Sequence, residues 1–157
     1  VSRLNYGSAE SPTRGLFAGG YSPSNQNVIS YITIASAGNA TDFGDLSASA
    51  RGQTGTSSPT RALFAGGNNP GKLDVIEYVT IATTGDVTDF GNLQSGTSAP
   101  EGTSNKTRGI FAGGNDGSLT NTIDLVTIAS TGNATDFGDL TLARAQHGGS
   151  SNGHGGL

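Results

Sequence analysis

The run Thr13-Arg14-Gly15-Leu16-Phe17-Ala18-Gly19-Gly20 decides the fold, because it occurs three times in the 157-residue chain. It returns at 60–67 and again at 107–114, each time with one substitution, which gives a repeat period of 47 residues. Self-similarity at a fixed period is the sequence signature of repeat architectures. We therefore interpret the chain as an array of equivalent units.

Each unit is expected to hold four strands. The first is small and polar, as in 52–57, and the second is the apolar run that ends at the glycine pair. The third is the richest in β-branched residues, as in Val28–Ala35, and a turn at 36–39 leads to a fourth strand that carries Phe43. The same aromatic returns one and two periods later, at Phe90 and Phe137.

The third strand of each unit is apolar on both faces. Side chains alternate along a strand, so Ile29 and Tyr31 point opposite to Ile32 and Ile34. Such a strand must be covered on both sides, which favours four-stranded sheets stacked on copies of themselves. Small residues fit the crowded axis of such a stack and larger ones its rim, as in a β-propeller. The predicted fold class is all-β, a β-propeller-type array of four-stranded blades.

The repeat content amounts to three full units and a partial fourth. Their approximate bounds are 3–50, 51–97, 98–143 and 144–157. Propellers typically need about four to eight blades, so three do not close a ring. Either two chains together close six blades, or the chain is the C-terminal part of a longer protein that supplies more. A β-trefoil, also built from three four-stranded units, is the alternative fold.

The pattern resembles the kelch repeat, in which a glycine pair is followed by a tyrosine and then by a further aromatic. The residues that carry this resemblance are Gly19, Gly20, Tyr31 and Phe43; Gly66, Gly67, Tyr78 and Phe90; and Gly113, Gly114, Leu125 and Phe137. Phe stands where kelch repeats usually have Trp, and Leu125 replaces the tyrosine. The resemblance implies kelch-like blades over nearly the whole chain.

The stretch 128–140, Ile-Ala-Ser-Thr-Gly-Asn-Ala-Thr-Asp-Phe-Gly-Asp-Leu, is similar to repeats in virion proteins of marine bacteriophages. This second resemblance implies a tail-fibre or similar appendage protein, located on the virion and outside the cell. It also implies partners among other virion proteins or copies of the same chain. A cell-surface glycan is a further expected partner.

Composition excludes several function classes. The absence of cysteine removes disulfides, thiolate metal sites and cysteine nucleophiles. Eight Lys and Arg in a chain of net charge −4 do not form the basic face that nucleic acid requires. No apolar run approaches the roughly 18 residues of a membrane helix, and no Gly-x-Ser-x-Gly elbow occurs. We expect no nucleic-acid partner, no membrane insertion, no enzyme, no metal and no cofactor.

Charged residues recur at two positions of the unit. An arginine opens the apolar strand and an aspartate precedes the phenylalanine: Arg14, Arg61 and Arg108, and Asp42, Asp89 and Asp136. A ring of such charges could grip an anion or a sugar, but repetition in every unit favours pairing at blade junctions. The oxygen pairs Asp42/Asp45, Asp89/Asn92 and Asp136/Asp139 suit calcium by chemistry, although turn capping is the favoured interpretation.

The loop after the glycine pair differs in every unit, and loops on a rigid scaffold are where binding usually occurs. The candidate ligand-binding residues are therefore Tyr21, Asn25, Asn68, Asn69, Asn115 and Asp116. His147 and His154, the two histidines, are interpreted as part of a polar glycine-rich tail.

These observations predict a non-enzymatic structural or adhesion module of a phage virion appendage. An extracellular kelch-like lectin or protein-interaction module is the alternative. An enzyme whose site lies in sequence before Val1 is a third hypothesis, from a different class.

Overall fold

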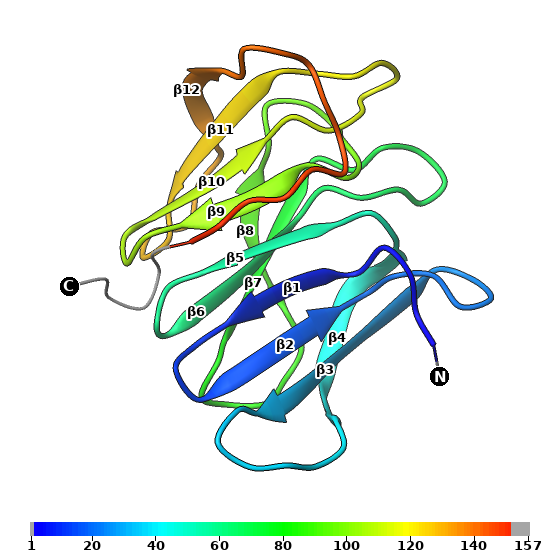
Figure 1. Ribbon diagram of the computed structural model, residues 1–157, viewed down its shortest axis with the longest axis vertical. Helices are drawn as coiled ribbons and strands as arrows, with labels where there is room; N and C mark the ends of the chain where they lie inside the picture. The colour runs from blue at the N-terminus through cyan, green and yellow to red at the C-terminus, as the bar shows by residue number, and fades with distance from the viewer. Residues whose placement is uncertain (1, 152–157) are drawn as a thin grey trace.

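The computed structural model describes residues 2–151, and over this range every regular element is a strand. Twelve strands form three four-stranded antiparallel sheets (Figure 1). The first sheet holds β1 (Gly7–Glu10), β2 (Arg14–Ala18), β3 (Gln26–Thr33) and β4 (Thr41–Ala50). The second holds β5 (Thr54–Ser57), β6 (Arg61–Ala65), β7 (Val75–Thr80) and β8 (Thr88–Asn92). The third holds β9 (Glu101–Ser104), β10 (Arg108–Ala112), β11 (Thr122–Thr127) and β12 (Thr135–Asp139).

In each sheet the strands are neighbours in chain order. The prediction of an all-β chain is thus confirmed, and each 47-residue unit builds one sheet. Three separate sheets of this kind are not the β-trefoil that was the alternative. No helix long and apolar enough to cross a membrane occurs among residues 2–151.

The turn between the first two strands of each unit is set by its sequence. The hydroxyl of Ser11 accepts a hydrogen bond from the backbone N of Arg14 at 3.1 Å, and Ser58 does the same for Arg61 at 3.1 Å. In the third unit the side-chain oxygen of Asn105 accepts from Arg108 N at 2.8 Å. Serine and asparagine favour such turns because their side chains bond backbone groups a few residues on.

In the first two units, the second glycine of the pair bonds the last residue of its own unit. Gly20 N donates to Ala50 O at 2.8 Å, and Gly67 N donates to Thr97 O at 2.8 Å. Gly19 has a φ of 65°, in the left-handed region that favours glycine, and a Cβ there would overlap the side-chain oxygen of Gln53. Backbone conformation and close packing therefore both require glycine at this position.

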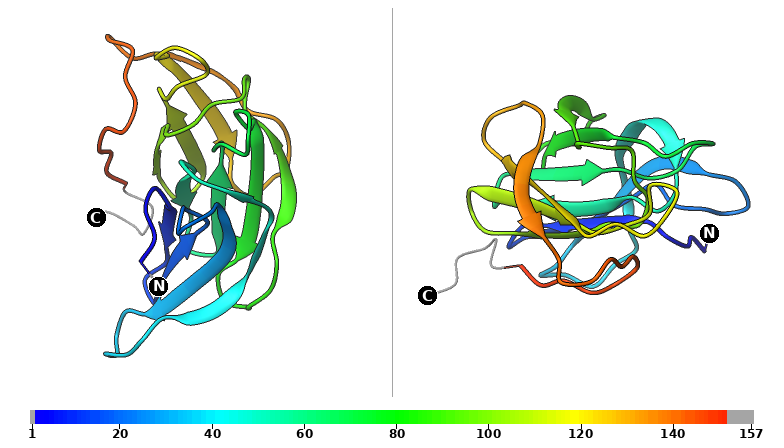
Figure 2. Two further views of the ribbon diagram at one scale, coloured as in Figure 1. Left: turned by 90° about the vertical axis from the view of Figure 1, so that its right-hand side faces the viewer. Right: turned by 90° about the horizontal axis from the view of Figure 1, so that it is seen from above.

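Two apolar layers hold the three sheets together, with the second sheet in the middle (Figure 2). We call the face of a sheet that points to the next unit its leading face, and the opposite one its trailing face. The first layer joins the leading face of the first sheet to the trailing face of the second: Ala9, Leu16, Ala18, Ile29, Phe43 and Leu46 against Ala62, Phe64, Val79 and Ile81. The second layer repeats it one unit later: Leu63, Ala65, Ile76, Phe90 and Leu93 against Phe111, Val126 and Ile128.

The prediction that both faces of a sheet are covered is confirmed for the second sheet. Within residues 2–151 of the single chain, one face of each outer sheet has no sheet packed on it. Ile34 is 53% exposed, whereas its repeat equivalent Ile81 is 2% exposed. Phe137 is 54% exposed, whereas its equivalent Phe90 is 2% exposed. The difference arises because no described sheet lies on the trailing face of the first sheet or on the leading face of the third.

The first strands of the three units lie next to one another, β1 beside β5 and β5 beside β9. A Cβ on Gly55 would overlap the carbonyl oxygen of Ser8, and one on Gly102 would overlap that of Gly55. Backbones that approach this closely leave no room for a side chain. The sequence expectation of small residues at the axis agrees with this placement.

Candidate functional site

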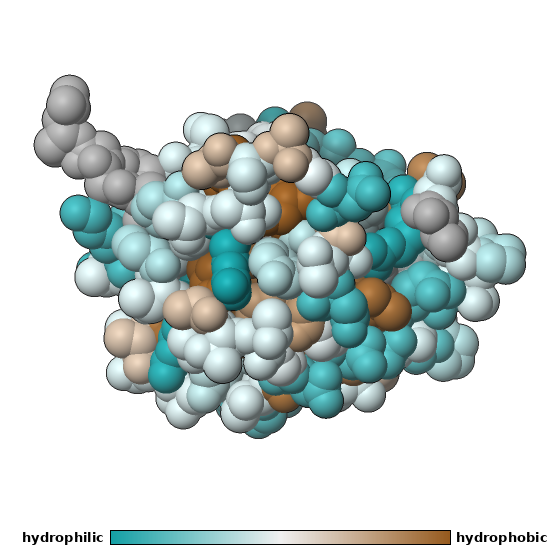
Figure 3. All heavy atoms as spheres, turned by 90° about the horizontal axis from the view of Figure 1, so that it is seen from below, coloured by the Kyte–Doolittle hydropathy of each residue, from teal (hydrophilic) through white to brown (hydrophobic). Residues whose placement is uncertain are grey.

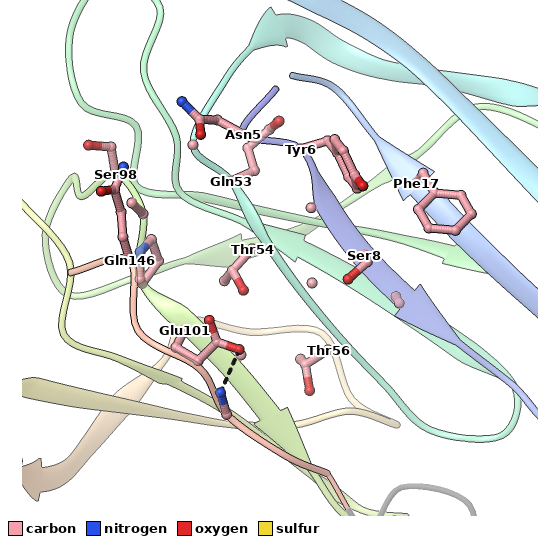
Figure 4. Close-up of a pocket in the computed structure, with 18 of the residues that line it drawn as sticks. Asn5, Tyr6, Ser8, Phe17, Gln53, Thr54, Thr56, Ser98, Glu101 and Gln146 are labelled. Carbon is pink, nitrogen blue, oxygen red and sulfur yellow. Dashed lines mark hydrogen bonds between the residues drawn. The ribbon is translucent and has the colours of Figure 1, made fainter. Parts of the chain in front are cut away.

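A groove with a volume of about 1050 Å³ runs along the first strands. Its lining comes from every unit and from the segment after β12 (Figure 4). Hydroxyl and amide groups dominate it: Asn5, Ser8, Gln53, Thr54, Thr56, Ser98 and Gln146. Glu101 adds a carboxylate, which accepts a hydrogen bond from Gly149 N at 3.0 Å. Groups of this kind suit a neutral polyhydroxylated ligand.

One end of the groove is set by a repeated backbone conformation. Asn5, Ala99 and Gln146 have φ values of 54°, 54° and 55°, which are uncommon outside glycine, and Gly52 at the equivalent place has 69°. Hydrogen bonds connect these residues from unit to unit: Gly52 N to Asn5 O at 2.7 Å, Ala99 N to Gly52 O at 2.6 Å and Gln146 N to Ala99 O at 3.2 Å. The recurrence in every unit indicates a structural linkage between units.

The candidate loop residues of the first two units lie close together. The guanidinium of Arg51 lies 5.1 Å from the ring centre of Tyr21, and the side-chain N of Asn25 donates to Asn68 O at 3.0 Å. In the second loop, Lys72 Nζ donates to Ser98 Oγ at 2.7 Å. Asn68, Lys72 and Arg51 also line the groove, so these loops form its rim.

Within residues 2–151, the side chains of the remaining loop candidates make no hydrogen bond to this rim. Asn69 is exposed. Asn115 and Asp116 make local bonds within their own loop, accepting from Gly117 N at 3.1 Å and from Ser118 N at 3.2 Å. The structure therefore joins Asn25 to Asn68 and Tyr21 to Arg51. The backbone of Asn115 bonds that of the groove residue Ser98 at 2.9 Å in both directions, whereas the bonds of the Asn115 and Asp116 side chains stay within their own loop.

The repeated arginines lie at the junctions between sheets. Arg14 Nη1 donates to Ile81 O at 2.7 Å, and Arg61 Nη1 donates to Ile128 O at 3.0 Å. The two guanidinium groups also lie over tyrosine rings, 4.7 Å from the centre of Tyr31 and 4.5 Å from that of Tyr78. Arg108, with no further described sheet beside it, is exposed.

The interpretation of the repeated aspartates as turn caps is wrong in its placement. Asp42, Asp89 and Asp136 lie within β4, β8 and β12, where a bulge follows from the register shift in each sheet. Asp136 Oδ1 still accepts a local bond from Gly138 N at 3.2 Å. No cluster of three potential metal ligands occurs among residues 2–151.

His147 is not part of a free polar tail. It is half-buried, and its ring lies where a Cβ on Gly113 would come within 3.0 Å of it. His147 occupies the repeat position of Gln53, and the side chain of Gln53 lies against Gly19 in the same way. Among the described residues, His147 Nδ1 and Gln53 Oε1 are buried without a hydrogen-bond partner. His154 lies outside the described residues.

Two buried carboxyl groups were missed by the sequence analysis. Glu77 and Asp124 occupy one repeat position in β7 and β11; Glu77 Oε1 accepts from Ser47 N at 3.2 Å, and Asp124 Oδ1 accepts from Gln94 Nε2 at 2.7 Å. Burial raises the pKa of both, against the lowering effect of these hydrogen bonds. The sequence signal that could have revealed both groups is an acidic residue within an otherwise apolar strand.

These carboxyl groups predict a specific pH dependence. A pKa raised in the folded state means that the folded chain holds the proton more tightly than the unfolded chain, so this contribution to stability falls as the pH rises through the raised pKa. The double variant Glu77→Gln, Asp124→Asn should lose this decline toward neutral pH. Urea unfolding at several pH values between about 4 and 8, from the usual carboxyl pKa upward, would measure this decline in the free energy of unfolding. Asp42→Asn, an exposed loss of charge, is the control and should keep the wild-type slope.

Comparison with known proteins adds no relative: no protein-family model matches the chain, and no curated protein matches it.

Proposed function

We propose that the chain is a non-enzymatic structural and adhesion module of a bacteriophage virion appendage, built from kelch-like blades of a β-propeller. In this proposal it acts on the virion and outside the cell. Its partners are other virion proteins, copies of itself and a host-surface glycan.

The observation that carries this proposal is the repetition of one junction between stacked sheets. The same apolar face, the same arginine contact and the same glycine approach occur between the first and second sheets and between the second and third. Such a scaffold presents variable loops on a rigid frame, which is how binding modules are commonly made. The similarity of 128–140 to phage virion repeats supplies the setting.

The setting is tested on gradient-purified particles of a phage that encodes this chain. We expect its peptides at a stoichiometry comparable to other appendage proteins, and we expect the labelled chain to bind host cells. Finding the chain only in the infected cell and never in particles would overturn the virion assignment.

An extracellular lectin is the second candidate, favoured by the hydroxyl- and amide-lined groove. Tyr21 lies beside this groove, in contact with its lining residue Arg51. Tyr21 is 38% exposed, so its ring face can stack on a sugar. If this candidate is right, Tyr21→Ala should weaken glycan-array binding by about tenfold or more.

The matched control for that variant is Leu119→Ala, an exposed apolar residue (55%, against 38% for Tyr21) in the corresponding loop of the third unit. It should leave glycan binding unchanged. Equal binding by the wild-type chain and Tyr21→Ala would remove Tyr21 from the site, and no binding to any glycan would favour the structural role.

A further inference from the structure

The two outer faces of the molecule are equivalent to the two faces that pack against each other at each internal junction. Within residues 2–151, no sheet covers either outer face. The trailing face of the first sheet carries Phe17, Ile32 and Ile34, at the repeat positions of the buried Phe64, Val79 and Ile81. Seen from below, apolar atoms are visible at several separate places between polar and near-neutral ones (Figure 3). At the opposite end, the leading face of the third sheet exposes Phe137.

The internal junctions show in detail how two such faces meet. At the first junction Gly85 N donates to Phe43 O at 2.7 Å, Asp45 N to Asp86 Oδ1 at 2.9 Å and Val87 N to Asp45 O at 3.0 Å. The second junction repeats all three bonds with Gly132, Asn133 and Ala134 on Phe90 and Asn92, at 2.7, 3.0 and 2.8 Å. The contact thus consists of an outer strand and the loop of the following unit.

The outer faces hold the groups for a third copy of this contact. Phe137 and Asp139 lie at the strand positions of the third sheet, and Gly38, Asn39 and Ala40 lie at the loop positions of the first unit. All three loop residues are exposed. We infer that a second copy of this chain docks head to tail, with the trailing face of its first sheet on the leading face of the third sheet.

The repeated arginine supports the same arrangement. Arg14 and Arg61 each donate to the carbonyl 67 residues further on, at Ile81 and Ile128. In the docked pair, the exposed Arg108 reaches the equivalent carbonyl, that of Ile34 in the second copy. Leu125 stands where the stacking tyrosine of the other units lies, so Arg108 keeps the hydrogen bond and loses the ring contact.

The axial end of the new junction is held by the C-terminal segment. Ser104 N donates to Ser151 Oγ at 3.1 Å, as Ser57 N donates to Ser104 Oγ at 3.4 Å one unit earlier. Thr103 Oγ1 likewise bonds Ser150 O, as Thr56 Oγ1 bonds Thr103 O. Residues 148–151 therefore lie beside β9 at the place of a further first strand.

The docked copy cannot bring its own β1 to that place. The bonds of Thr103 and Ser104 to Ser150 and Ser151 already occupy the side of β9 that faces the second copy. Residues 148–151 consequently pair with β2 of the docked copy and displace its β1, a strand exchange of the kind seen in domain swapping.

This inference deepens the proposed function by describing how one proposed partner, a second copy of the chain, is bound. It rests on the proposed function only in that the latter calls for such a partner. The contact is heterologous, so two copies that use both ends form a closed six-sheet ring if the rotation closes. Virion membership plays no part in the contact, and the association of purified chains is therefore a test separate from the analysis of particles.

Gly138 offers the sharpest variant. The equivalent glycines, Gly44 and Gly91, have φ near +149° and +147°, and a Cβ on either would overlap the next unit's loop carbonyl, at Gly85 or Gly132. Gly138 has φ +136°, and a Cβ there meets nothing within 4 Å. Gly138→Val therefore blocks only a sheet docked from outside. Gly117→Val, at φ +143° with nothing within 4 Å, is the control for backbone strain.

Sedimentation equilibrium of the full chain tests the inference. We expect a dimer for the wild type and for Gly117→Val, and a dissociation constant raised by about a hundredfold or more for Gly138→Val. Phe137→Asp, an exposed substitution that places a carboxylate in the junction, should do the same and covers a failure of Gly138→Val to fold. A wild-type chain that stays monomeric at about 100 µM overturns the inference, as does an unchanged dimer in Phe137→Asp.

The strand exchange is tested separately on a chain that ends at His147. It lacks the segment that pairs with β2 of the second copy, so it should associate at least about tenfold more weakly than the full chain. Association of the shortened chain with wild-type strength would overturn the exchange.

Discussion

Phe90→Ala should lower the free energy of unfolding by about 3 to 5 kcal/mol, whereas Phe137→Ala should change that of the monomeric chain by less than about 0.5 kcal/mol. Both are measured at a chain concentration too low for two copies to associate. Both residues stand in the same Thr-Asp-Phe-Gly sequence, in equivalent strands β8 and β12. Phe90 is 2% exposed and packs in the layer between the second and third sheets, and Phe137 is 54% exposed. The difference between the variants therefore measures the contribution of the neighbouring sheet.

Burial explains the size of the expected loss. Removing a buried phenylalanine costs the transfer of its apolar surface and leaves a cavity that the surrounding side chains fill only in part. Tyr78 lies against Phe90 edge-to-face, with ring centres 6.0 Å apart, and loses that contact as well. Urea unfolding checks both variants, with the m-value as the test that the unfolded state is unchanged. Equal losses at the two positions in the monomeric chain would show that Phe90 is not buried between two sheets.

The stacking of the sheets could be predicted from the sequence because it follows from local patterns. The glycine pair marks the end of the second strand, and alternation in the third strand shows two apolar faces, as with Ile76 and Val79 in β7. Both patterns lie within one unit and depend on no distant residue. A period of 47 residues then shows that the same sheet is built three times.

The outer faces could not be predicted in the same way, because burial depends on a neighbouring unit and not on the strand's own sequence. Ile34 and Ile81 are both isoleucines after equivalent strands, yet one is exposed and the other buried. The aspartates illustrate a second limit. Asp42 was assigned to a turn because aspartate is common there, but register and packing place it in β4.

The candidate groove was only partly visible in the sequence. Asn68 and Tyr21 stood out because their loops differ between units, whereas the groove itself is built from the first strands, which look featureless. The left-handed residues Asn5, Ala99 and Gln146 share no residue type, so no pattern of letters reveals their common conformation. Their equivalence becomes visible only through the backbone.

Gly102→Val should destabilise the protein by about 3 kcal/mol or more, whereas Ser8→Val should change the free energy of unfolding by less than about 0.5 kcal/mol. The two residues occupy the same place in the first strand of the third and first units. A Cβ on Gly102 would overlap the carbonyl oxygen of Gly55, which is a backbone atom and cannot rotate away. Ser8 is exposed and already has a Cβ.

Valine favours strands by its own propensity, so a loss at Gly102 cannot come from a poor strand former. It must come from separating β9 from β5, which would also pull apart the hydrogen bond from Thr56 Oγ1 to Thr103 O at 3.0 Å. Thermal and urea unfolding measure the loss, and protection of the Ser57 and Ser104 amides from hydrogen exchange locates it. A Gly102→Val protein as stable as Ser8→Val would mean that the first strands lie further apart than the close approach at the axis requires, and the axial packing of the three units would have to be abandoned.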